Sequence, residues 1–105
     1  MVISLTTSRV TPEQAQQVED FLQGYLPKVQ QEPGVVSIYH FHRPDPGQST
    51  TIITWETDEA RQAYRESELI AEAVALERKL DLTSVRKAHP LAYASQRLQK
   101  MRPRG

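Results

Sequence analysis

Two histidines are the side chains in this chain best suited to acid–base chemistry. His40 and His42 lie two residues apart in an apolar run, so in a strand their side chains point to the same face. An imidazole titrates near neutral pH and can accept the proton of a phenol. The pair is therefore a candidate for general-base catalysis.

The same spacing leaves two other interpretations open for this pair. Two histidines could bind a metal ion, but a metal site needs three or more ligands and no third one lies nearby in the sequence. The pair could also be half-exposed polar residues at a hairpin mouth or a subunit interface. The chain contains no Cys, which excludes thiolate ligands and disulfides. No glycine-rich phosphate loop is present, and we expect neither a metal nor a cofactor.

Aromatic residues near the histidines are the second chemical feature. A flat substrate is commonly held between apolar and aromatic walls. Core packing is the alternative role for such residues, and the two roles are compatible because a pocket needs an apolar wall. The predicted aromatic wall consists of Tyr39, Phe41, Trp55 and Tyr64.

Four strands and two helical regions must position these side chains. Runs rich in Val, Ile and Thr predict strands over residues 2–10, 35–42, 50–56 and 83–94. Pro90 predicts that the last strand ends there or lies at a sheet edge.

Helix signals separate these strands. Thr11, Pro12 and Gln14 form a capping pattern ahead of a stripe of apolar residues that includes Tyr25, which we assign to the core. Pro27 predicts a kink or a division of that helix. Thr57 caps the second helical region, which restarts near Ser67.

The resulting order is β-α-β-β-α-β, which predicts an α+β, ferredoxin-like fold with a four-stranded antiparallel sheet. We expect one domain over residues 1–94 and a basic tail over residues 95–105.

Both faces of the second strand carry apolar side chains. Strict alternation places Val36, Ile38, His40 and His42 on one face, and Val35, Ser37, Tyr39 and Phe41 on the other. Helices cover only one face of such a sheet, so we expect the other to pack against a second copy in a homodimer.

The charges are unevenly distributed. All 13 acidic side chains precede residue 82, whereas 6 of the 13 basic ones follow it. A basic tail can attract nucleic acid or an anionic membrane, but it can equally fold against the acidic body. The tail lacks interleaved aromatic residues, which argues against nucleic-acid binding. No signal peptide or membrane-spanning run is visible, and we expect a cytoplasmic protein without membrane contact.

Two segments resemble a known family. Glu32-Pro33-Gly34-Val35-Val36-Ser37 entering a strand, and Thr54-Trp55-Glu56-Thr57-Asp58-Glu59-Ala60 leading into a helix, are similar to the antibiotic biosynthesis monooxygenase family. Tyr64-Arg65-Glu66-Ser67 fits as well. The resemblance covers roughly residues 2–94 and implies a dimeric α/β barrel of ferredoxin-like subunits.

The haem-degrading branch of that superfamily does not match at three positions. It has an Asn, a Trp and an iron-binding His where this chain has Ser8, Tyr64 and Val74. Valine cannot ligate iron, so the resemblance argues against haem degradation.

The cofactor-free branch matches better. Its strand-three Trp, which lines a pocket between sheet and helices, corresponds to Trp55. Some members have an Asn where this chain has Thr51, which donates a single hydrogen bond. The resemblance implies a cofactor-independent monooxygenase that oxidises a small electron-rich aromatic, phenol or quinol with O₂. His40 or His42 would be the base, Trp55 and Tyr64 would orient the ring, and Thr51 or Ser8 would hydrogen-bond oxygen. The alternative is a non-enzymatic dimer of the same fold that binds a small ligand or a protein.

Overall fold

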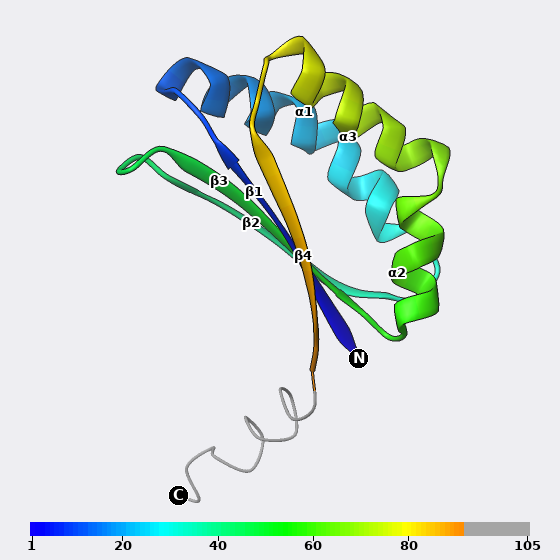
Figure 1. The fold of residues 1–105 in the computed structure, drawn as a ribbon. Helices are drawn as coiled ribbons and strands as arrows, with labels where there is room; N and C mark the ends of the chain where they lie inside the picture. The colour runs from blue at the N-terminus through cyan, green and yellow to red at the C-terminus, as the bar shows by residue number, and fades with distance from the viewer. Residues whose placement is uncertain (92–105) are drawn as a thin grey trace, which may run out of the picture.

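The computed structural model describes residues 1–91 as a four-stranded antiparallel sheet covered on one face by three helices (Figure 1). The elements in chain order are β1 (Val2–Arg9), α1 (Pro12–Gln30), β2 (Val35–Arg43), β3 (Gln48–Trp55), α2 (Asp58–Arg65), α3 (Glu68–Lys79) and β4 (Ser84–Pro90). The sheet order is β2-β3-β1-β4. The predicted α+β, ferredoxin-like fold is confirmed.

The helix boundaries follow the predicted capping residues. Thr11 accepts a hydrogen bond from the Gln14 backbone N–H, and the Gln14 side chain accepts one from the Thr11 backbone N–H. Thr57 caps α2 through the backbone N–H of Ala60. The second helical region does divide at Ser67, which is the residue before α3.

Pro27 does not divide α1, which continues to Gln30. The proline lies in the last turn of the helix, so its missing N–H removes a single bond close to the end. Pro90 ends β4, and β4 lies at a sheet edge, as predicted.

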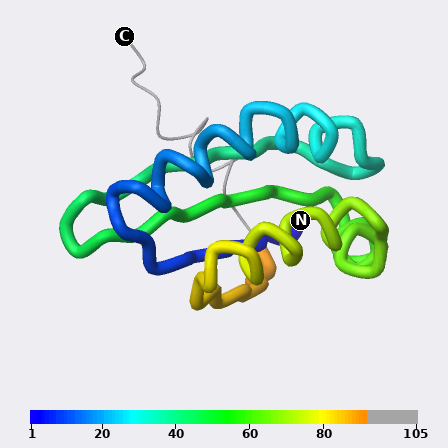
Figure 2. The backbone as a smooth tube through the Cα atoms, turned by 90° about the horizontal axis from the view of Figure 1, so that it is seen from above, coloured from blue at the N-terminus to red at the C-terminus, as the bar shows by residue number. Residues whose placement is uncertain are grey.

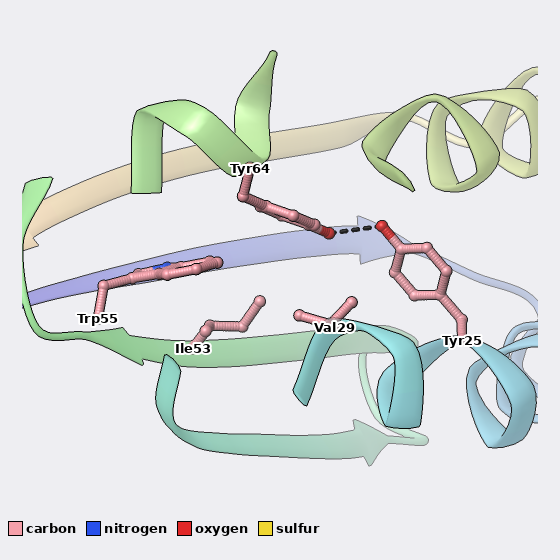
Figure 3. Packing of buried hydrophobic residues seen from close by; sticks show 5 residues of the cluster. All are labelled: Tyr25, Val29, Ile53, Trp55 and Tyr64. Atoms are coloured by element: carbon pink, nitrogen blue, oxygen red, sulfur yellow. Dashed lines mark hydrogen bonds between the residues drawn. The ribbon is translucent and has the colours of Figure 1, made fainter. Parts of the chain in front are cut away.

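Two clusters of apolar side chains fill the space between the helices and the sheet. The larger contains Tyr25, Val29, Ile53, Trp55 and Tyr64 (Figure 3). The smaller contains Val10, which follows β1, together with Ala15 and Val18 of α1. Figure 2 shows α1 above the β2 side of the sheet and α3 above the β4 side.

No helix within residues 1–91 is long and apolar enough to cross a membrane. The expected basic tail, residues 95–105, lies outside the described residues. Of the basic residues after position 81, Arg86 belongs to β4 and forms an ion pair with Glu77 of α3.

Candidate functional site

A pocket of about 90 Å³ lies between the sheet and the helices. A single water molecule needs roughly 10–15 Å³, so the space suits a small organic molecule or several waters. Its apolar lining comes mainly from side chains of α1 and α3, including Phe21, Leu22, Ile70 and Ala73. Its polar lining comes mainly from the sheet.

Strand register explains why the floor of the pocket is polar. Alternate residues of a strand share a face, and the pairing places His40, Thr51, Thr6 and Arg86 side by side across the four strands. A second row, one step along, consists of His42, Ser49, Ser8 and Ser84. Toward the other end of the same face, Ile38 pairs with Ile53, and Val35 pairs with Trp55. The helix-facing surface is therefore polar at one end and apolar at the other.

His40 is the candidate base that lines this pocket. Its Nδ1 lies 3.0 Å from the Thr51 hydroxyl oxygen. Its Nε2 is buried and has no hydrogen-bond partner among the described residues. Burial lowers the pKa of His40, with a smaller contribution from His42, while Glu19 on α1 opposes the shift. His40 is therefore neutral at pH 7, the form that accepts a proton.

His42 shares a face with His40, as predicted, but does not line the pocket. Its Nδ1 lies 3.1 Å from the backbone carbonyl of Gln48. A carbonyl only accepts hydrogen bonds, so Nδ1 of His42 carries the proton. The structure thus separates two histidines that the sequence pattern treats alike.

Tyr64 lines the pocket together with Tyr25, which the sequence pattern assigns to the core. Their hydroxyl oxygens are 2.5 Å apart (Figure 3). Burial raises the pKa of both side chains, so both are protonated at physiological pH. Tyr25 belongs both to the core and to the pocket wall, a double role that helical periodicity alone cannot reveal.

Trp55 is completely buried and does not line the pocket. Its ring packs against that of Tyr64 with centroids 5.3 Å apart, and its Nε1 donates to the Ser4 hydroxyl over 3.1 Å. The indole therefore supports a pocket residue from behind instead of forming the wall that the family resemblance implies.

Tyr39 and Phe41 lie on the opposite face of the sheet, where they are 65% and 43% exposed. They cannot line the pocket of the same subunit, because successive side chains of a strand alternate between faces. A register shift between Val35 and Ser37 also changes the predicted faces. Val35 packs into the core while Val36 is exposed, the reverse of what strict alternation predicts, because a bulge adds one residue to the strand.

Thr51 and Ser8 both line the pocket, one in each polar row. The Thr51 hydroxyl is engaged with His40, and the Ser8 hydroxyl lies 2.7 Å from that of Ser84. Ser49, which the sequence analysis does not single out, also lines the pocket, and its buried hydroxyl has no partner among the described residues.

Arg86 and Glu77 are further pocket residues that sequence reasoning missed. Arg86 donates from both terminal nitrogens to the two carboxylate oxygens of Glu77, at 3.0 and 2.5 Å. Both side chains are less than one-fifth exposed. A turn between α3 and β4 separates the two residues in sequence, and this arrangement forms no recognisable sequence motif. Only the fold therefore reveals that they pair.

No group of three potential metal ligands occurs among residues 1–91.

Comparison with known proteins gives the chain a family and a fold. A candidate antibiotic biosynthesis monooxygenase from Deinococcus radiodurans is 21% identical, with a TM-score of 0.81, covering 90% of this chain and 95% of the other. SnoaB, a cofactor-independent oxygenase from Streptomyces nogalater, is 15% identical, with a TM-score of 0.66 and coverage of 87% and 92%. Rv0793 from Mycobacterium tuberculosis is 16% identical, with a TM-score of 0.69 and coverage of 90% and 100%. At these identities the likeness shows a shared fold.

No curated protein matches the chain in sequence. The family pattern described as antibiotic biosynthesis monooxygenase matches residues 1–76. This match spans well over half of the sequence and agrees with the observed fold, so the chain belongs to the antibiotic biosynthesis monooxygenase family.

Proposed function

We propose that this protein is a monooxygenase that oxidises a small electron-rich phenol or quinol with O₂, without a bound cofactor, and that His40 is its general base. The observation that carries the proposal is the position of His40: it lines the pocket, it has a lowered pKa, and its buried Nε2 lacks a partner. A phenol hydroxyl supplies the proton that this nitrogen would accept.

Proton transfer to His40 would convert the substrate to an electron-rich phenolate. The phenolate, unlike the neutral phenol, is a good one-electron donor to O₂. In the complete reaction one oxygen atom replaces hydrogen on a ring carbon and the other leaves as water. The substrate loses the ring hydrogen and the hydroxyl hydrogen and becomes a quinone. His40 then returns to its neutral form.

The tautomer of His40 follows from this role. Nε2 can accept a proton only if Nδ1 carries one, and Nδ1–H then donates to the Thr51 hydroxyl. Thr51 would act as a positioning residue for the base, while Ser8 and Tyr64 would contact the substrate from the sheet and from α2. Trp55 would hold the Tyr64 ring in place.

We also infer that two copies of the chain pair through the open face of the sheet. Val36, Tyr39, Phe41 and Val85 are each at least 43% exposed, and Tyr39, Phe41 and Val85 project from this face. Large apolar side chains gathered on one sheet face are typical of subunit interfaces. In this arrangement Tyr39 and Phe41 stabilise the dimer and do not contact a substrate held in their own subunit.

The test is oxygen uptake together with quinone absorbance on a panel of naphthols, anthrones and quinols, with no cofactor added. We expect turnover by the wild type and a loss of roughly 100-fold or more in His40→Gln, because a positioned general base contributes about 10²–10⁴-fold. His42→Gln is the matched control, and its turnover should stay within about threefold of the wild type.

Equal turnover in the wild type and in His40→Gln would refute the proposed role of the base. A folded protein that turns over none of the panel but binds its members would instead favour a non-enzymatic, ligand-binding dimer of the same fold.

A further inference from the structure

The hydroxyl pair of Tyr25 and Tyr64 has one proton more than it uses. Two phenol groups carry two O–H donors, and the single bond between their oxygens engages one of them. The second O–H belongs to the accepting hydroxyl, and no described residue accepts it. Both rings line the pocket and each is less than one-tenth exposed, so a ligand in the pocket is a natural acceptor for this proton.

Burial ensures that the pair donates and does not ionise. It raises the pKa of both tyrosines, and the charge of Arg86 opposes the rise in each case. Arg86 lines the same pocket as the two tyrosines.

Arg86 adds further donors to the same pocket. A guanidinium has five N–H groups, and Glu77 accepts from two of them. None of the other three is bonded to a described residue. Within residues 1–91, Glu77 is the only acidic side chain that lines the pocket, and Arg86 already occupies its carboxylate. Around these residues the pocket is therefore rich in donors and poor in free acceptors.

Arg86 lies across the sheet from His40. His40 and Arg86 belong to the same row of paired residues, on the two outer strands. Three strand spacings of about 4.8 Å separate their Cα atoms by roughly 14 Å. Because both side chains line one pocket, a ligand that reaches both must be polar at two opposite ends.

We propose that Tyr25, Tyr64 and Arg86 form a second subsite, which binds a ligand oxygen that only accepts hydrogen bonds, a carbonyl or a carboxylate. The inference rests on the proposed function for the ligand's other end, where an ionisable hydroxyl faces His40. It names the substrate class as a phenol or naphthol that carries a carbonyl or carboxylate on the far side of its ring system.

Binding of three matched naphthols, measured by calorimetry, tests this subsite without requiring turnover. The probes are 2-naphthols with a carboxylate, an acetyl or an isopropyl group at position 6, which match in the number of heavy atoms. We expect the carboxylate and acetyl probes to bind wild-type protein at least about fivefold more tightly than the isopropyl probe, as one or two added hydrogen bonds imply. A gain for the carboxylate alone would identify the anion as the preferred source of the oxygen.

Two double variants locate the donors. Tyr25→Phe with Tyr64→Phe removes both hydroxyls together and should abolish the gain of the acetyl probe. Arg86→Met with Glu77→Gln removes the ion pair without leaving a buried charge unpaired, and should reduce the gain of the carboxylate probe most. The controls are Tyr39→Phe, which removes a hydroxyl on the other face, and Lys28→Met, which removes a cation whose partner is Glu72 on the helical surface. Circular dichroism confirms folding of each variant.

Equal affinity of the three probes for wild-type protein, or a gain that survives in both double variants, would overturn the subsite. A purely structural role of the tyrosine pair would change the melting temperature of the double variant but not the ranking of the probes. Oxygen uptake separates this inference from the proposed function. Tight, donor-dependent binding without turnover would support the subsite and refute the oxygenase activity. Turnover without a preference among the probes would support the oxygenase activity and refute the subsite.

Discussion

His40 and His42 show how neighbouring residues of one type acquire different chemistry. Both point to the helix-facing side of β2. His42 donates a hydrogen bond to a backbone carbonyl through Nδ1. His40 lines the pocket, and its buried Nε2 has no hydrogen-bond partner among the described residues. The difference arises from what lies above each side chain, because the strand presents both in the same way.

The lowered pKa of His40 predicts how stability depends on pH. The unfolded chain binds a proton at the ordinary histidine pKa of about 6.5, whereas the folded chain does so only at lower pH. Between these two values the unfolded state holds more protons, so stability falls as the pH drops below about 6.5. Well above pH 6.5 His40 is neutral in both the folded and the unfolded state, so its titration no longer lowers the stability.

Urea unfolding of wild type and His40→Gln between pH 5 and pH 8 measures this dependence. We expect the difference in unfolding free energy between the two proteins to change across the window and to level off above about pH 7. The charged groups that shift the pKa of His40 are Glu19 on α1 and His42 on its own strand. His42→Gln is the control, because it removes one of these groups and leaves His40 in place. A difference that stays constant with pH would contradict the lowered pKa.

Among the elements, the start of β2 is held close to the start of α2 by a glycine. Gly34 has a φ of +85°, and a Cβ there would lie 2.6 Å from the Ala60 Cβ. Its carbonyl accepts a hydrogen bond from the Glu56 backbone N–H over 2.8 Å. A side chain at position 34 would strain the backbone and push α2, which carries Tyr64, away from the sheet.

Gly34→Ala should therefore destabilise the protein by about 2 kcal/mol or more, since a left-handed conformation alone costs an L-residue roughly 1–2 kcal/mol. Gly24→Ala is a matched substitution in α1, where nothing lies within 4 Å of the added Cβ. It should stabilise the fold by about 0.5–1 kcal/mol, because alanine is the better helix former. Urea denaturation of both variants checks the two signs, and a loss of stability in both would show that the local geometry is not the cause.

At the scale of the whole molecule, the sheet has one covered and one open face. The helices cover the first (Figure 1), and the pocket lies between them and the sheet. On the second, Tyr39 and Phe41 expose large aromatic surfaces to solvent in a single copy of the chain. Burying such surface between two copies is favourable by roughly 25 cal/mol per Å² of apolar area.

A charge on the open face should consequently dissociate the inferred dimer. We expect wild-type protein to elute as a particle of twice the 12.0 kDa chain mass in size-exclusion chromatography with light scattering, and Phe41→Glu to shift it toward the monomer. Gln23→Glu adds the same charge on the exposed side of α1 and should leave the mass unchanged. A monomeric wild type, or a dimer that Phe41→Glu does not affect, would count against this interface.

Local sequence signals predict most of the fold. Thr11, Gln14 and Thr57 mark helix starts at the observed positions because a cap acts on backbone groups two or three residues away. Ser67 precedes α3 as predicted, although its side chain makes no capping hydrogen bond. Strand alternation correctly places His40 and His42 on one face for the same reason: side-chain direction follows from the backbone. The bulge near Val36 is missed because it depends on the pairing with β3.

The candidate site depends on the tertiary structure. Tyr25 meets Tyr64 across 39 positions of the chain, and Glu77 meets Arg86 across a turn. These contacts are set by how α1, α2 and α3 rotate and pack on the sheet, which no local pattern specifies. For the same reason Trp55 lies behind the pocket wall, and Tyr39 and Phe41 lie on the other side of the sheet. The order and type of the elements follow from interactions between near neighbours in sequence, whereas the pocket is made by residues that only packing brings together.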